Sequence, residues 1–91
     1  MQLIYKIHHP KLQKITISKL SNLKYFVGLN SLKEIDTKQL DEINNIELII
    51  DPTQIILLNV VKLTANPVFL SLFKNIRKLM IWNYCEKIDF V

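Results

Sequence analysis

The sequence contains very little glycine and cysteine. Its 91 residues include one glycine, Gly28, and one cysteine, Cys85. Glycine-rich phosphate loops and strained nucleophile elbows both need several closely spaced glycines, so the sequence excludes these two kinds of site. A lone cysteine forms no disulfide within its own chain, and small secreted domains usually contain several. We therefore expect an intracellular, cytoplasmic protein.

Long hydrophobic runs are absent as well. The most apolar windows, PTQIILLNVV and LTANPVFLSLF, are ten and eleven residues long and are separated by Lys62. A membrane-spanning helix needs about 20 apolar residues. The apolar start MQLIYKI is interrupted by Lys6, and no small-residue cleavage site follows it, so we expect neither a signal peptide nor a membrane protein.

Aliphatic side chains are abundant, and the charges are unevenly distributed. Hydrophobic residues make up 49% of the chain and charged residues 22%, which is typical of a globular protein, here one domain over residues 1–91. The net charge of +4 combines basic ends with an acidic middle between residues 31 and 60. This pattern fits an anionic partner as well as an ordinary solvated surface.

Periodicity and capping residues in the first half predict strands and helices in alternation. An apolar run at residues 3–7 indicates a buried strand, and a helix over residues 18–28 ends at the glycine. Ser31 and Glu34 have the spacing of a capping box, which predicts a second helix toward residue 43. The β-branched run IELII, residues 46–50, predicts another strand.

The second half carries the clearest capping signals. Asp51-Pro52 and Asn66-Pro67 each place a capping side chain directly before a proline, which suits the first position of a helix. Apolar residues at helical spacing then predict a helix over residues 69–80, followed by a last strand, KIDFV. The predicted order is β-α-α-β-α-α-β, an α/β fold whose fully apolar strands favour a parallel sheet.

A repeat offers a second interpretation of the same residues. Segments of fifteen residues counted from Ser31 place Asp36, Asp51 and Asn66 at the same position. The chain also resembles leucine-rich-repeat proteins, because Leu12-Ile15-Ile17 and Ile76-Leu79-Ile81 match their L-x-x-L-x-L pattern, and residues 85–89 resemble the end of a cysteine-containing repeat. The resemblance implies a solenoid of stacked parallel strands, in which residues 76–81 form a strand instead of a helix.

A weaker resemblance concerns the barstar family of ribonuclease inhibitors. The predicted element order is similar to that family's, and Phe26, Gly28 and Asn30 echo its aromatic-glycine-x-asparagine signature. The resemblance implies an immunity-type inhibitor of a nuclease or toxin.

Catalytic and metal-binding patterns are not found. His8 and His9 are adjacent, so on a strand they would point to opposite faces and would not share a metal ion. The carboxylates are expected to act as caps or to lie on a solvated helix face: Glu34, Asp36, Asp41 and Glu42. We predict no enzyme activity, no metal and no cofactor, and we expect Cys85 to be a structural thiol.

A basic group of residues is the one candidate binding site. On the predicted helix, Lys74, Lys78 and Trp82 share one face with Arg77 beside them, an arrangement in which cations neutralise phosphates and the indole stacks on a base. The plainer interpretation is a solvated helix face that a tryptophan closes. We expect a non-enzymatic protein–protein interaction module, associating with a partner or with itself, and keep nucleic-acid binding as the alternative.

Overall fold

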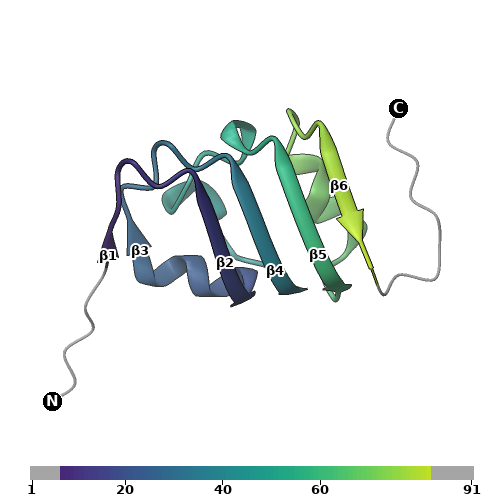
Figure 1. Cartoon of the computed structure of the whole chain (residues 1–91). Coiled ribbons are helices and arrows are strands. Elements are labelled where there is room, and N and C mark those ends of the chain that lie inside the picture. Colours follow the sequence, from purple (N-terminus) through teal and green to yellow (C-terminus); the bar gives the residue numbers. More distant parts are fainter. Residues whose placement is uncertain (1–6, 83–91) are drawn as a thin grey trace, which may run out of the picture.

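Four parallel strands form the central sheet (Figure 1). The structure, a computed structural model, describes residues 7–82. The strands are β2 (Lys14–Lys19), β4 (Glu34–Leu40), β5 (Leu57–Leu63) and β6 (Lys78–Ile81), and they lie side by side in this order. The predicted small α/β domain with a mainly parallel sheet is confirmed at this level.

Short helical turns connect the strands behind the sheet. They are 3₁₀ helices: η1 (Leu20–Tyr25), η2 (Ile46–Leu48), η3 (Pro52–Gln54) and η4 (Pro67–Leu72). Two further strands, β1 (Ile7–His8) and β3 (Phe26–Val27), pair in parallel beside the main sheet. Each connection carries the chain away from the end of one strand and back to the start of the next, which is what a parallel sheet requires.

The register shows that the chain coils once for each strand. Ile15 pairs with Ile35, 20 positions later, and Ile35 pairs with Leu58, 23 positions later. Leu58 then pairs with Leu79, after a further 21 positions. The fifteen-residue spacing in the sequence is therefore not the structural repeat. Each coil contains about one and a half times that length because it must include both a strand and its return.

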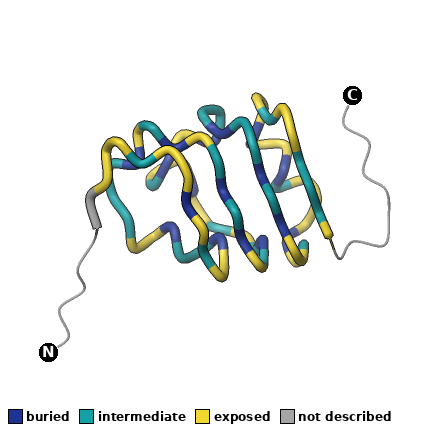
Figure 2. Tube along the Cα trace, in the orientation of Figure 1, coloured by how far each residue is buried: buried dark blue, intermediate teal, exposed yellow. Residues whose placement is uncertain are grey.

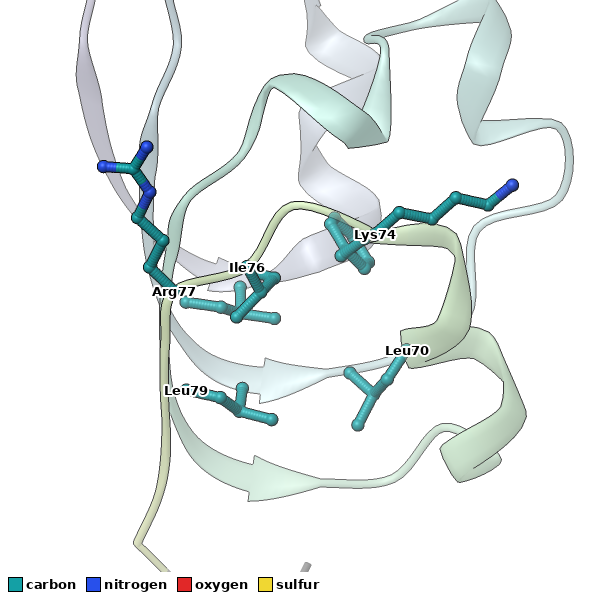
Figure 3. Close-up of a pocket in the computed structure, with 7 residues that line it drawn as sticks. Leu70, Lys74, Ile76, Arg77 and Leu79 are labelled. Atoms are coloured by element: carbon teal, nitrogen blue, oxygen red, sulfur yellow. The ribbon is translucent and has the colours of Figure 1, made fainter. Parts of the chain in front are cut away.

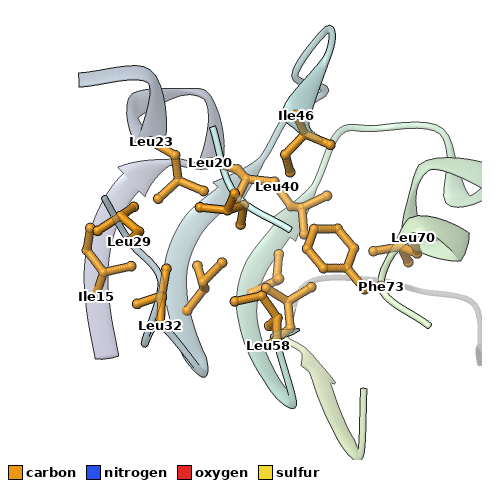
Figure 4. Close-up of a cluster of buried hydrophobic side chains, with 14 of the residues drawn as sticks. Ile15, Leu20, Leu23, Leu29, Leu32, Leu40, Ile46, Leu58, Leu70 and Phe73 are labelled. Carbon is orange, nitrogen blue, oxygen red and sulfur yellow. The ribbon is translucent and has the colours of Figure 1, made fainter. Parts of the chain in front are cut away.

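One face of the sheet forms the core (Figures 2 and 4). Strand residues alternate between two faces, and the residues paired across neighbouring strands share a face. Ile35, Leu58 and Val60 are completely buried on the inner face, and Leu70 and Phe73 pack against them from the return segment. The inner positions repeat with one spacing in each coil: Leu12-Ile15-Ile17, Leu32-Ile35-Thr37, Ile55-Leu58-Val60 and Ile76-Leu79-Ile81.

Two polar side chains are accommodated at or beside this core. The buried hydroxyl of Thr37 donates to the carbonyl oxygen of Gln39 at 2.8 Å, so a threonine replaces an aliphatic residue without an unsatisfied group. The side-chain amide of Gln54 donates to the carbonyl oxygens of Leu29 and Leu32, at 2.6 and 2.9 Å. This amide links one coil to the preceding coil.

The two proline-marked caps are confirmed. The Asp51 carboxylate accepts the backbone N–H of Thr53 at 3.0 Å, and the Asn66 side chain accepts that of Val68 at 3.0 Å. The hydroxyl and the N–H of Thr53 both stabilise the charged carboxylate, which lowers the pKa of Asp51 below its ordinary value. These caps begin 3₁₀ helices of only three and six residues, however.

The predicted helix over residues 69–80 is wrong. The helical turn ends at Leu72, and residues 78–81 form β6, whose backbone pairs with β5. The backbone N–H groups of Arg77 and Lys78 both donate to the carbonyl oxygen of Ile56. The spacing of Ile76 and Leu79 fits a helix and equally fits the turn before a strand, and pairing with β5 decides between them.

The other predicted elements differ in a similar way. Residues 34–40, predicted as a helix, form β4, and the expected strand over residues 46–50 contains η2, which begins after Asn45 at a positive φ of 57°. The helix predicted over residues 18–28 is reduced to η1, with Gly28 beyond it at φ 69°. No α-helix occurs between residues 7 and 82, so the order β-α-α-β-α-α-β is not observed there. Most of the first predicted strand, and KIDFV and Cys85, lie outside the described residues.

Two adjacent valines on β5 provide a matched test of which face is buried. Val60 is completely buried and Val61 is 41% exposed. We expect Val60→Ala to lower the free energy of unfolding by about 2 kcal/mol or more, because it removes buried methyl groups and leaves a cavity. Val61→Ala should cost less than about 1 kcal/mol. Urea denaturation of both variants checks this, and equal losses would contradict the assignment of faces.

Candidate functional site

The second face of the sheet carries exposed side chains. We call it the outer face and define it by the strand residues that alternate with the core positions as far as Lys38 and Val61, together with Trp82, which directly follows β6. These residues are Lys14, Thr16, Ser18, Glu34, Asp36, Lys38, Leu57, Asn59, Val61, Lys78, Met80 and Trp82. No helical turn crosses the front of the strands in Figure 1. Within the described residues, this is a broad surface that the core does not use.

The outer face is polar on one side and more apolar on the other. On β2 and β4, the ammonium group of Lys14 lies 3.5 Å from the carboxylate of Asp36. Their side chains are 56% and 27% exposed, so this ion pair contributes at most about 1 kcal/mol to stability. On β5 and β6 the aliphatic and aromatic side chains of Val61, Met80 and Trp82 predominate. A ligand lying across the strands would therefore contact charged groups on β2 and β4 and an apolar surface on β5 and β6.

A hollow of about 200 Å³ lies in the middle of this face. Its floor includes the hydroxyl-bearing Thr16, the carboxylate of Asp36 and the amide of Asn59, which occupy one row across β2, β4 and β5. Lys38 and Val61 line it toward the carboxyl ends of the strands. These groups can donate and accept hydrogen bonds over a short distance, which suits side-chain recognition.

Trp82 is the most prominent residue of the outer face. The residue is 66% exposed, yet its indole N–H donates to the side-chain oxygen of Asn59 at 2.6 Å. Its backbone N–H donates to the carbonyl oxygen of Val60 at 2.9 Å. The ring is thus held toward β5 and remains accessible. An aromatic ring fixed before binding loses little conformational entropy when a partner covers it.

The four residues predicted as a basic site do not form a single cluster on a helix. Lys74 follows η4 and Arg77 precedes β6, and both line a separate cavity of about 350 Å³ next to Leu70 and Ile76. Their charged ends extend in different directions from this cavity (Figure 3). Of the four, Lys78 and Trp82 share the outer face, at opposite ends of β6. The arrangement predicted on one helix face is therefore wrong, since the helix is absent.

The carboxylates predicted as caps or solvated groups are mostly engaged with neighbouring coils. Asp41 accepts the backbone N–H of Ser21 at 2.9 Å, and Glu42 accepts that of Asn66 at 2.9 Å. Asp36 is the residue that pairs with Lys14. In residues 7–82 no three histidine, cysteine or acidic side chains are grouped so as to hold a metal ion. Over the same range, no helix has the length and apolar character needed to cross a bilayer.

The sequence contained a signal for this surface. In residues 34–38, apolar or small inner side chains alternate with charged outer ones, as at Ile35, Asp36, Thr37 and Lys38. The capping-box spacing of Ser31 and Glu34 concealed this period of two by favouring a helix. On β5 the continuous apolar run hides the alternation, because Val61 is apolar and yet points outward.

The hydrogen bond between Trp82 and Asn59 is directly testable, because Trp82 is the only tryptophan in the sequence. Asn59→Leu removes the acceptor, so we expect lower steady-state anisotropy of the tryptophan emission and stronger quenching by acrylamide. Asn59→Asp keeps an acceptor oxygen and should behave like the unmodified protein. If Asn59→Leu left both fluorescence measurements unchanged, the indole would not be held by this bond.

Comparisons with known proteins were made at three levels. No family model matches the chain, and neither a curated protein nor a solved structure does.

Proposed function

We propose that the protein is a short solenoid of the leucine-rich-repeat type that binds another protein through its outer face and has no enzymatic activity. Four coils support the solenoid of the leucine-rich-repeat type, since each coil contributes one parallel strand and the same spacing of inner residues. The three spacings between successive coils, 20, 23 and 21 residues, fall within the roughly 20 to 29 residues typical of such repeats.

The accessible and fixed indole of Trp82 is the observation that carries the binding function. Tryptophan is enriched among the residues that dominate protein interfaces, because a large ring buries much area in a single position. Here Trp82 is 66% exposed and lies beside the exposed Val61. A partner that covers both would bury apolar surface next to groups that can form hydrogen bonds.

The shape of the outer face favours a protein over a small molecule. Pockets for small ligands usually enclose about 300 to 1,000 Å³. The hollow on the outer face has a volume of only about 200 Å³ and is lined by three different strands. A broad surface with a small central hollow suits the side chains of a protein partner, whose contact is spread over a larger area.

The charges of the outer face also favour a protein over nucleic acid. Its three lysines, at positions 14, 38 and 78, are accompanied by Glu34 and Asp36 at the centre of the sheet. Carboxylates in the middle of a surface repel phosphates, and nucleic-acid interfaces are strongly positive. Nucleic-acid binding through Lys74, Arg77, Lys78 and Trp82 is accordingly the outcome that the experiment below must distinguish.

Two narrower forms of this function are compatible with the proposal. An immunity-type inhibitor would use the outer face to cover a toxin or nuclease, and a homo-oligomer would use it to bind a second copy of the chain. The single cysteine is the reason for placing either form inside the cell.

Site-specific photo-crosslinking in cells tests the proposal. A photoreactive phenylalanine analogue replaces either Val61 on the outer face or Val68, which is 73% exposed on η4. We expect a discrete crosslinked protein from position 61 that persists after nuclease treatment, and no such product from position 68. Products that are equal at both positions, or that nuclease removes, would contradict binding of a protein by the outer face.

A further inference from the structure

One row of the outer face combines a cation with the two exposed apolar side chains. Thr37 pairs with Val60 and Gln39 with Lys62, which places Lys38 beside Val61. Val60 pairs with Ile81, which places Val61 beside Trp82. The row Lys38-Val61-Trp82 therefore crosses three neighbouring strands toward their carboxyl ends. Lys38 and Val61 also line the same hollow.

Exposed lysines gather at this end of the sheet. Lys19 and Lys62 flank Gln39 in the next row, and both are exposed, as is Lys38. Within residues 7–82, none of these three lysines forms an ion pair, in contrast to Lys14. Their ammonium groups are therefore available to carboxylates from outside the chain.

The acids nearest this end are already engaged. Asp41 and Glu42 follow β4, and each accepts a backbone N–H from a neighbouring coil, from Ser21 and from Asn66. Three lysines and these two acids leave the end with a small positive charge, and the acids are held at the returns of the chain. The opposite half of the outer face has no net formal charge, because Lys14 and Lys78 there are balanced by Asp36 and Glu34.

We propose that the row Lys38-Val61-Trp82 is the docking site for an acidic segment of a partner protein. An aliphatic or aromatic side chain of that segment packs on Val61 and Trp82, and its carboxylates meet Lys38, while the exposed Lys62 in the next row adds to the positive charge nearby. The proposal rests on the proposed function of the outer face and specifies its partner. Charge complementarity selects the acidic segment and steers its approach, while the apolar contact provides most of the affinity.

The spacing of the row fits an extended segment that lies across the strands. Neighbouring strands are about 4.8 Å apart, so Lys38 and Trp82, two strands apart, are separated by roughly 10 Å along the row. An extended peptide covers this distance in about three residues. A carboxylate and an apolar residue three positions apart would therefore reach both ends of the row. In the other half Glu34 and Asp36 balance Lys14 and Lys78, so that half attracts an acidic segment less than the row does.

Selection from a random peptide library displayed on phage tests the partner chemistry. The immobilised full-length protein is the bait, and the selected peptides are then synthesised with a fluorescent label for anisotropy titrations. We expect enrichment of aspartate and glutamate together with one aliphatic or aromatic residue. We also expect the binding of a selected peptide to shift the emission of Trp82 to shorter wavelength, because the peptide removes water from the indole.

Matched variants locate the bound peptide. Lys38→Glu and Trp82→Ala should each weaken binding about fivefold or more, as residues central to an interface do. Lys33→Glu makes the same charge change at the other end of β4, where the side chain is also exposed, and should weaken binding less than twofold. Circular dichroism confirms that each variant is folded. Raised salt should weaken binding of the acidic peptides.

Three results would overturn this proposal. The first is enrichment of basic or uncharged peptides, and the second is no enrichment at all. The third is binding of acidic peptides that is equally sensitive to Lys33→Glu and Lys38→Glu. Peptides of another composition that still lose binding with Trp82→Ala would leave the proposed function intact and reject only the acidic partner. Selective, tight binding of a single-stranded oligonucleotide that depends on Lys74 and Arg77 would reject both.

Discussion

The structure depends on the stacking of one aliphatic side chain from each coil on the next. Ile15, Ile35, Leu58 and Leu79 occupy a single row, and the backbone ladder that aligns them is parallel throughout. A strand of four to seven residues has little stability alone, and it remains paired only when one of its faces is buried. Because the side-chain period is two, a shift of one residue would expose the entire row. The register is therefore fixed by burial.

The same constraint produces the outer face. Alternation that sends Ile35 and Leu58 inward sends Asp36 and Asn59 outward. The outer side chains are not part of the core, so packing of the core does not constrain which residues occupy these positions. Coiling then brings together side chains that are far apart in the sequence. Lys38, Val61 and Trp82 come from three different coils and form one row only because the register aligns them.

The class of the fold and both proline-marked caps could be predicted from the sequence, whereas most element types could not. Spacing of apolar residues by three or four fits a helix and equally a coil in which a turn precedes a strand, as Ile76 and Leu79 show.

The match of residues 12–17 and 76–81 to one repeat pattern could be recognised in the sequence, but the matches in the two coils between them could not. In the coil that contains β4, Thr37 replaces an aliphatic residue of the pattern. In the coil that contains β5, the cap at Asp51 favoured a helix instead of a strand. Lys78 and Trp82 were named as candidate binding residues and do lie on the outer face, although they were predicted on a helix that does not form. Lys38 and Val61 were missed because adjacency across strands cannot be read from local spacing.

Nuclear magnetic resonance of the isotopically labelled protein tests the central claim most directly. We expect strand-type chemical shifts for residues 78–81, together with nuclear Overhauser contacts that link the inner residues of β6 to β5 and those of β5 to β4. In particular, Val60 should contact both Thr37 and Ile81, which are its partners in the ladder. Continuous helical shifts from residue 69 to residue 80, without contacts between Val60 and Ile81, would contradict the coiled parallel sheet and the outer face built on it.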